Sequence, residues 1–226
     1  MTFREVDIAF QVIVFLFAIS AHESAHAWMA WRLGDPTARM LGRVSLNPIR
    51  HIDPIGTVLL PALAIITHFP VIGWAKPTPV DPRHFKHYVR DDILTSVAGP
   101  VSNFLIASAA VVGMILISMG SMQGRMIVQN MASGYISDTG SFLMPLTLLL
   151  YEAMQINVLL GVFNLIPVPP LDGSHVLRHF LSEGVRRVYD SIGIFGLLLL
   201  MFLGGRVLGA LMFPVVNFFN SLLLKI

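Results

Sequence analysis

A long apolar run, residues 8–31, carries in its second half the polar pattern His22-Glu23-Ser24-Ala25-His26. About 20 apolar residues suffice for a helix that crosses a membrane. Helix positions four apart share one face, so the two imidazoles can chelate one metal ion while Glu23 serves as general base. Ionisable side chains at membrane depth are costly and mark functional sites. We interpret the pattern as catalytic; the alternative is a chance pattern in an ordinary helix with polar residues near its end.

The composition is that of an integral membrane protein. Hydrophobic residues make up 55% of the chain, charged residues only 12%, and the mean hydropathy is +0.73; soluble domains carry about 25% charged residues. With 226 residues, several spans leave no room for a large soluble domain, so residues 1–226 are expected to form one domain. The chain has no cysteine, so nitrogen and oxygen ligands must hold any metal.

The apolar segments predict an all-α polytopic membrane protein, because a backbone in lipid must satisfy its own hydrogen bonds. Six segments stand out: 8–31, 54–72, 92–119, 141–166, 189–203 and 207–224. Pro61 lies in the middle of the second segment and is a plausible helix breaker.

The basic residues predict the topology. Loops 32–53 and 73–91 each carry four Lys or Arg residues, whereas loop 120–140 has only Arg125. Cytoplasmic loops hold the excess of Lys and Arg, so both basic loops should be cytoplasmic. The second segment then enters the membrane and returns, which gives about five transmembrane helices plus a re-entrant segment. The amino terminus should lie outside the cell membrane and the active site toward the cytoplasm. The pI near 9.2 reflects this topology, and nucleic-acid binding is not expected.

A third metal ligand is expected at the end of the fourth segment, because a catalytic zinc usually has three protein ligands and an open position. Asp172 is the best candidate. Prolines 167, 169 and 170 break the helix before it, and Gly173 permits a close backbone approach. The alternative is that Asp172 caps a helix that begins near Ser174.

The chain resembles the site-2 proteases, the intramembrane zinc metalloproteases, over about residues 8 to 180. Two motifs that carry the resemblance are His22-Glu23-Ser24-Ala25-His26 and Leu171-Asp172-Gly173; the others are Ala98-Gly99-Pro100-Val101-Ser102-Asn103 and Gly73-Trp74-Ala75-Lys76-Pro77-Thr78-Pro79-Val80. Ser174 stands where many relatives have a second glycine. Neither a PDZ nor a CBS module is recognisable, as in the small bacterial and archaeal type.

The resemblance implies one Zn²⁺ held by His22, His26 and Asp172, with Glu23 as the catalytic base. It also implies that Asn103 binds the substrate backbone or the developing oxyanion. The alternative for Asn103 is a hydrogen bond between helices in the membrane. The implied partners are the lipid bilayer and a transmembrane protein whose helix is cut in regulated intramembrane proteolysis.

A helical substrate hides its carbonyl groups in its own hydrogen bonds, so the cleaved stretch must unwind. Residues 73–80 or Arg43-Val44-Ser45-Leu46 could offer an edge to which it adds as a strand, so a small membrane-associated β element is compatible with the fold. The alternative is that both stretches simply close the cavity. Glu152 is expected to face the bundle interior, with a gating or proton-relay role as the alternative.

Two other classes of protein compete with a protease. A metal transporter also places His, Asp and Asn in the membrane, but it more often shows paired repeats with broken helices, which this chain lacks. A catalytically silent scaffold should have lost Glu23 or a ligand, and all are present.

Overall fold

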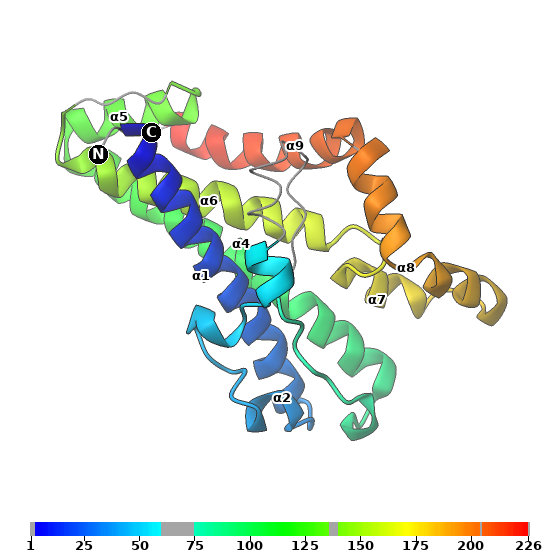
Figure 1. The fold of residues 1–226 in the computed structure, drawn as a ribbon. Helices are drawn as coiled ribbons and strands as arrows, with labels where there is room; N and C mark the ends of the chain where they lie inside the picture. The colour runs from blue at the N-terminus through cyan, green and yellow to red at the C-terminus, as the bar shows by residue number, and fades with distance from the viewer. Residues whose placement is uncertain (1–2, 60–74, 136–139, 204, 226) are drawn as a thin grey trace. The chain divides into compact units, whose positions relative to one another are not determined.

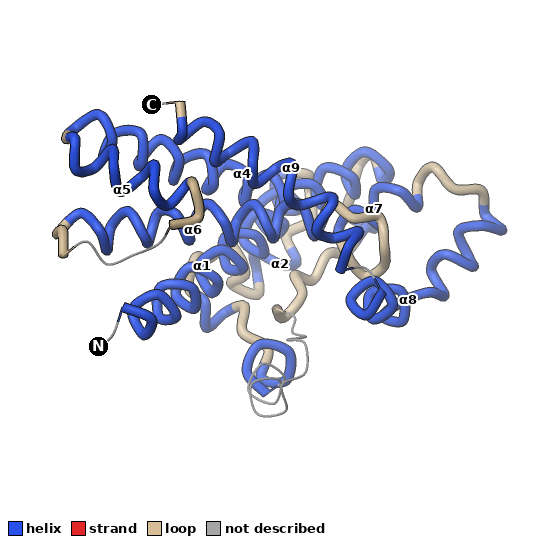
Figure 2. The backbone as a smooth tube through the Cα atoms, turned by 90° about the horizontal axis from the view of Figure 1, so that it is seen from above, coloured by secondary structure: helices blue, strands red, loops and turns tan. Residues whose placement is uncertain are grey.

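The computed structural model describes residues 3–59, 75–135, 140–203 and 205–225. Its helices are α1 (Phe3–Arg32), α2 (Thr37–Met40), α4 (Tyr88–Gly120), α5 (Met122–Ala132), α6 (Leu143–Asn164), α7 (Asp172–Arg178), α8 (Glu183–Leu203) and α9 (Gly205–Leu224). Short helical turns are η1 (Pro48–Arg50), η2 (Pro54–Leu59) and η3 (Pro82–His84). Figure 2 shows that the described part consists of helices and loops, which confirms the all-α expectation. Neither Arg43–Leu46 nor residues 75–80 form a strand.

Three of the described helices, α1, α4 and α6, are long and apolar enough to cross a membrane. They correspond to the first, third and fourth apolar segments, and they support a membrane protein. Helices α8 and α9 cover the last two segments, but the total number of crossings stays a prediction. The second segment begins with η2, and Pro61 with the rest of the expected re-entrant turn falls outside the described residues.

Helix α5 lies where the hydropathy pattern indicated only a loop, residues 120–140. Its apolar residues cover one face, and Ile127, Val128 and Met131 on that face are buried. The opposite face is polar, so the average hydropathy of the helix is low. The Ser121 side chain caps the helix by accepting a hydrogen bond from the Gly124 N–H.

The chain divides into two compact units, residues 19–99 and residues 1–18 with 100–226. In the second unit, α5, α6 and α9 pack against one another (Figure 1). Part of α4 joins them in a core whose largest buried side chains include Met114, Met131, Leu148 and Met154. Small residues allow close packing where lipid gives no hydrophobic drive; a Cβ on Gly161 would lie 3.0 Å from the Phe104 ring.

In the unit of residues 19–99, α1 ends in a Schellman motif. Gly34 has a left-handed φ of 113°, its N–H donates to the Trp31 carbonyl, and the Asp35 N–H donates to the Ala30 carbonyl. The turn places Asp35 directly after the helix, with its side chain fully buried.

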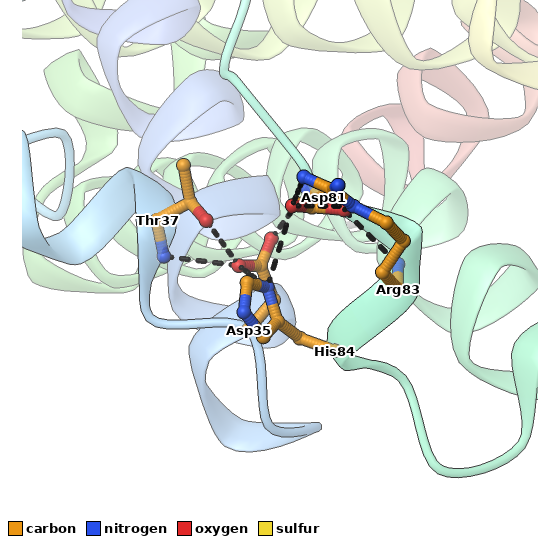
Figure 3. A network of polar contacts seen from close by, with 5 residues as sticks. All are labelled: Asp35, Thr37, Asp81, Arg83 and His84. Carbon is orange, nitrogen blue, oxygen red and sulfur yellow. Dashed lines mark hydrogen bonds and ion pairs between the residues drawn. The ribbon is translucent and has the colours of Figure 1, made fainter.

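Asp35 is the centre of a polar network that joins this turn to the segment before α4 (Figure 3). Its Oδ1 accepts hydrogen bonds from the N–H and the hydroxyl of Thr37. Its Oδ2 accepts from the Asp81 N–H at 2.7 Å, and His84 Nδ1 lies 3.2 Å from Oδ1. Burial by itself would raise the pKa of Asp35, but hydrogen bonds from Thr37 and Asp81, together with His84, hold that pKa below its ordinary value of 3.8.

The lowered pKa predicts acid sensitivity of this network. A carboxylate whose folded-state pKa is lowered stabilises the protein above its unfolded-state pKa, and this contribution is lost as pH falls through the folded-state value. In detergent, the wild type should therefore lose stability relative to Asp35→Asn as pH falls below 3.8. Thermal unfolding of both proteins between about pH 6 and pH 3 measures the difference. Parallel curves for the two proteins would contradict the prediction.

Candidate metal centre

The two histidines of the α1 pattern face each other one helical turn apart, as the spacing predicts. Both side chains are buried, with His22 6% and His26 8% exposed. Their rings meet edge to face with centroids 4.6 Å apart, and the two Nε2 atoms are 3.0 Å apart. Two Nε2 ligands on one tetrahedral zinc would be separated by about 3.3 Å, so the pair is close to the spacing that a shared ion requires.

A backbone carbonyl orients one of the two rings. His26 Nδ1 lies 2.7 Å from the Thr95 carbonyl oxygen in α4. A carbonyl can only accept, so Nδ1 carries the proton and Nε2 keeps its lone pair for a metal. This is the usual arrangement around metal-binding histidines, in which the second ring nitrogen donates to a fixed acceptor.

Gly99 in α4 makes room for both rings. A Cβ at this position would lie 2.4 Å from His26 Nε2 and 2.6 Å from His22 Cε1, far inside contact distance. Only glycine fits, since the Cβ of any other residue would overlap both imidazole rings. Gly99 of the Ala98-Gly99-Pro100 motif therefore leaves the space that the two imidazole rings occupy.

Glu23 follows His22 in the sequence, and its side chain is held by the segment before α4. Its Oε2 accepts hydrogen bonds from the Thr78 N–H at 3.0 Å and from the Thr78 hydroxyl at 2.8 Å. The same hydroxyl lies 3.0 Å from the Glu23 carbonyl oxygen. These contacts with Thr78 hold the carboxylate in one orientation.

The donor set of this unit fits a zinc ion. Two imidazole nitrogens converge, one ring is fixed through its other nitrogen, and the residue after His22 is a glutamate with a fixed carboxylate. Thiolate ligands are absent from the sequence. The residues of this unit can supply two metal ligands and a base.

The other unit presents Asp172 as the first residue of α7. Helix α6 ends at Asn164, just before the proline-rich stretch, which confirms the expected helix break. Leu171, not Asp172, occupies the N-cap position, which leaves the capping alternative without support. A Cβ on Gly173 would lie 2.2 Å from the Leu165 carbonyl oxygen, and this confirms the close backbone approach expected at that glycine.

Asn103 is fully buried and is engaged with another helix. Its Nδ2 donates to Asn157 Oδ1 at 2.8 Å and lies 3.4 Å from the Ala18 carbonyl oxygen, while Asn157 Nδ2 donates to the Ala153 carbonyl. The geometry agrees with the interhelical alternative, and the substrate role of Asn103 stays a prediction. Glu152 is also buried and shares a hydrogen bond with Gln11 of α1, as expected for a residue facing the bundle interior.

Sequence reasoning gave no role to Asp35 and Thr95, and it named Thr78 only as part of a motif without its contact to Glu23. Thr95 contributes a backbone carbonyl, which no side-chain pattern reveals. Thr78 had a usable signal, since it stands between Pro77 and Pro79 and is the only residue of the three with an N–H. His84, which has no ligand spacing, serves as a partner of Asp35.

Replacing Gly99 with alanine should abolish metal binding while leaving the helices intact, because the added methyl would collide with both imidazoles. We expect the zinc content of the purified variant to fall to about a tenth of the wild-type value or less, since disruptions next to a metal site cost roughly 10- to 100-fold in affinity. Elemental analysis and circular dichroism measure the two properties. Gly120→Ala on the same helix is the matched control, since its Cβ would meet nothing within 4 Å. Full zinc occupancy in Gly99→Ala would contradict the arrangement.

Two asparagine variants separate the two interpretations of Asn103. If its amide serves the helix contact, Asn103→Ala and Asn157→Ala should destabilise the protein similarly, by about 0.6–2 kcal/mol, and the double variant should cost little more. We expect this result from the 2.8 Å bond. Thermal unfolding and peptide-cleavage rates are measured together. A loss of turnover in Asn103→Ala alone would instead favour substrate binding.

Comparisons with known proteins agree on one family. The family model described as "Peptidase family M50" matches residues 10–203. The chain is 33% identical over 216 residues to "Putative zinc metalloprotease YwhC" of Bacillus subtilis (strain 168), covering 95% of this chain and 89% of that protein. It is 25% identical to Rip2 of Mycolicibacterium smegmatis, a protein of the same description, over 83% of this chain and 63% of Rip2. No solved structure matches. The chain belongs to peptidase family M50, the family of the site-2 proteases.

Proposed function

We propose that this protein is an intramembrane zinc metalloendopeptidase that hydrolyses a peptide bond in or near a transmembrane helix of another membrane protein. The observation that carries the proposal is the pair of converging Nε2 atoms, with a positioned carboxylate beside them, on a helix long and apolar enough to cross a membrane. Membership of peptidase family M50 supports the same reaction class.

His22, His26 and Asp172 are the proposed zinc ligands. Two imidazoles and one carboxylate leave a fourth position open, which distinguishes catalytic zinc sites from closed structural ones. The end of α6 at Asn164 and the tight backbone packing at Gly173 fix the backbone around Asp172, which supports its role as a ligand. The relatives described as zinc metalloproteases support zinc rather than another divalent ion.

The proposed reaction gives the zinc ion, Glu23 and His26 separate roles. Bound zinc supplies Lewis acidity toward water and the peptide carbonyl. Glu23 accepts the proton of the attacking water and passes it to the leaving amine. His26 is kept in its metal-binding tautomer by the Thr95 carbonyl, so it needs no rearrangement during the reaction.

The proposed substrate is a transmembrane helix that unwinds locally, because an intact helix keeps its carbonyls in hydrogen bonds. The basic loops after the first and second apolar segments support a site on the cytoplasmic side of a multi-pass protein of the cell membrane. His26 lies near that end of α1, two helical turns before Leu33. Water reaches the site from the cytoplasm in this arrangement.

Glu23→Gln tests the proposal directly. Because glutamine cannot accept the proton, the variant should keep about one zinc per chain and lose cleavage of a membrane-embedded helical reporter by at least 10³-fold. Metal content and reporter cleavage are measured in detergent or vesicles, with and without a chelator. His22→Ala and Asp172→Ala should lose both zinc and cleavage.

The same measurements separate the competing classes. Zinc-dependent transport without cleavage would favour a metal transporter, and a wild type that holds no zinc would favour a silent scaffold. Equal cleavage by the wild type and Glu23→Gln would contradict the role of Glu23 as base.

A further inference from the structure

We propose that Thr78 is a positioning residue for Glu23, and that Asp35 fixes the segment that carries Thr78. The segment, residues 75–85, is called the strap here. The inference rests on the proposed function only in taking Glu23 as the base; the contacts themselves lie within the unit of residues 19–99.

The strap aims one backbone donor at Glu23. Pro77 and Pro79 have no N–H, so Thr78 supplies the only backbone donor in residues 77–79, and that donor reaches Glu23 Oε2 at 3.0 Å. The ring of Pro77 restricts its own φ, and Pro79 pushes Thr78 toward an extended conformation. The N–H of Thr78 therefore points in a set direction at little further entropic cost.

The Thr78 hydroxyl adds a second contact to the same carboxylate oxygen, at 2.8 Å. A hydroxyl carries one hydrogen, and the Glu23 carbonyl oxygen competes for it at 3.0 Å. Within the part of the chain that the structure describes, both hydrogen bonds to the carboxylate go to Oε2. Oε1 therefore stays available for the proton that the base must accept.

Three contacts anchor the strap on either side of Thr78. The Lys76 N–H donates to the His51 carbonyl at 2.9 Å. Beyond Thr78, the Asp81 N–H and the His84 ring both bind the buried Asp35 carboxylate (Figure 3). The His84 carbonyl also lies against Gly34, where a Cβ would stand 3.1 Å away.

Asp35 thus acts on Glu23 through the strap. It follows α1 immediately, and α1 itself carries Glu23. Asp35 binds the strap at Asp81, three residues beyond Thr78, so one end of the helix holds a segment that reaches back to the carboxylate. The exposed Arg83 lies outside this path, since among the described residues its guanidinium binds the Asp81 carboxylate.

The first test removes the Thr78 hydroxyl. Thr78→Val should lower kcat for the helical reporter by about tenfold, because one hydrogen bond to a charged group is lost. KM and zinc content should stay within about twofold, and Thr78→Ser should restore kcat. Thr147→Val is the matched control, since the buried Thr147 hydroxyl donates to the Leu143 carbonyl of its own helix. Wild-type kcat in Thr78→Val would overturn the role of the hydroxyl.

The second test asks whether Asp35 works through Thr78. Asp35→Asn puts an amide donor opposite the Asp81 N–H or the Thr37 donors, so the strap should loosen and kcat should fall. The double variant Asp35→Asn/Thr78→Val should lose less activity than the product of the two single losses. Asp81→Asn is the control, because Asp81 reaches Asp35 through its backbone N–H, which this substitution keeps. Independent, multiplicative losses would overturn the coupling.

Amide hydrogen exchange tests the contact without any activity. Exchange is followed residue by residue by NMR, because a fragment covering residues 75–80 would also carry the Lys76 and Val80 amides, although Pro77 and Pro79 have none. We expect exchange of Thr78 to speed up about tenfold or more in Glu23→Ala and in Asp35→Asn. Unchanged exchange in Glu23→Ala would overturn the inference even if the wild type cleaves the reporter. A wild type that holds zinc but cuts no reporter would count against the proposed function alone, and the exchange result would still decide the inference.

Discussion

The close approach of α4 to α1 at Gly99 is the constraint on which the rest of the site depends. The rings of His22 and His26 occupy the space that a Cβ would fill, and the Thr95 carbonyl one turn earlier fixes the tautomer of His26. The backbone of α4 thus provides the space for both rings at Gly99 and the hydrogen-bond acceptor for His26 at Thr95. The two histidines of α1 can therefore converge because the neighbouring helix α4 has a glycine, Gly99, directly opposite their rings.

Backbone groups do most of the positioning around the pair. A Thr95 carbonyl holds His26, and a Thr78 N–H holds Glu23. In a low-dielectric setting an unpaired polar group is costly, so each buried polar side chain needs a fixed partner. Backbone partners move less than long side chains, so they hold the side chains that they contact in a fixed place.

Several features of the fold and of the candidate site could be predicted from local sequence patterns. The spacing of His22 and His26 on one helix, the break after Asn164 and the close packing at Gly173 each follow from rules that need only neighbouring residues. Helix α5 escaped prediction because only one of its faces is apolar. The interhelical bond of Asn103 could be raised only as an alternative, because its partner Asn157 lies 54 residues away in the chain.

The sequence by itself determined that the chain is a helical membrane protein with an His-Glu-x-x-His pair and a distal aspartate suited to zinc. These features depend on composition and on short periodic spacings, which act within a few residues. Only the tertiary structure decided that Gly99 frames the histidines, that Thr78 holds Glu23, and that Asp35 holds the strap. Those contacts join residues 46 to 77 positions apart. A spacing of that length carries no periodic signal, because it is set by how the chain folds back on itself.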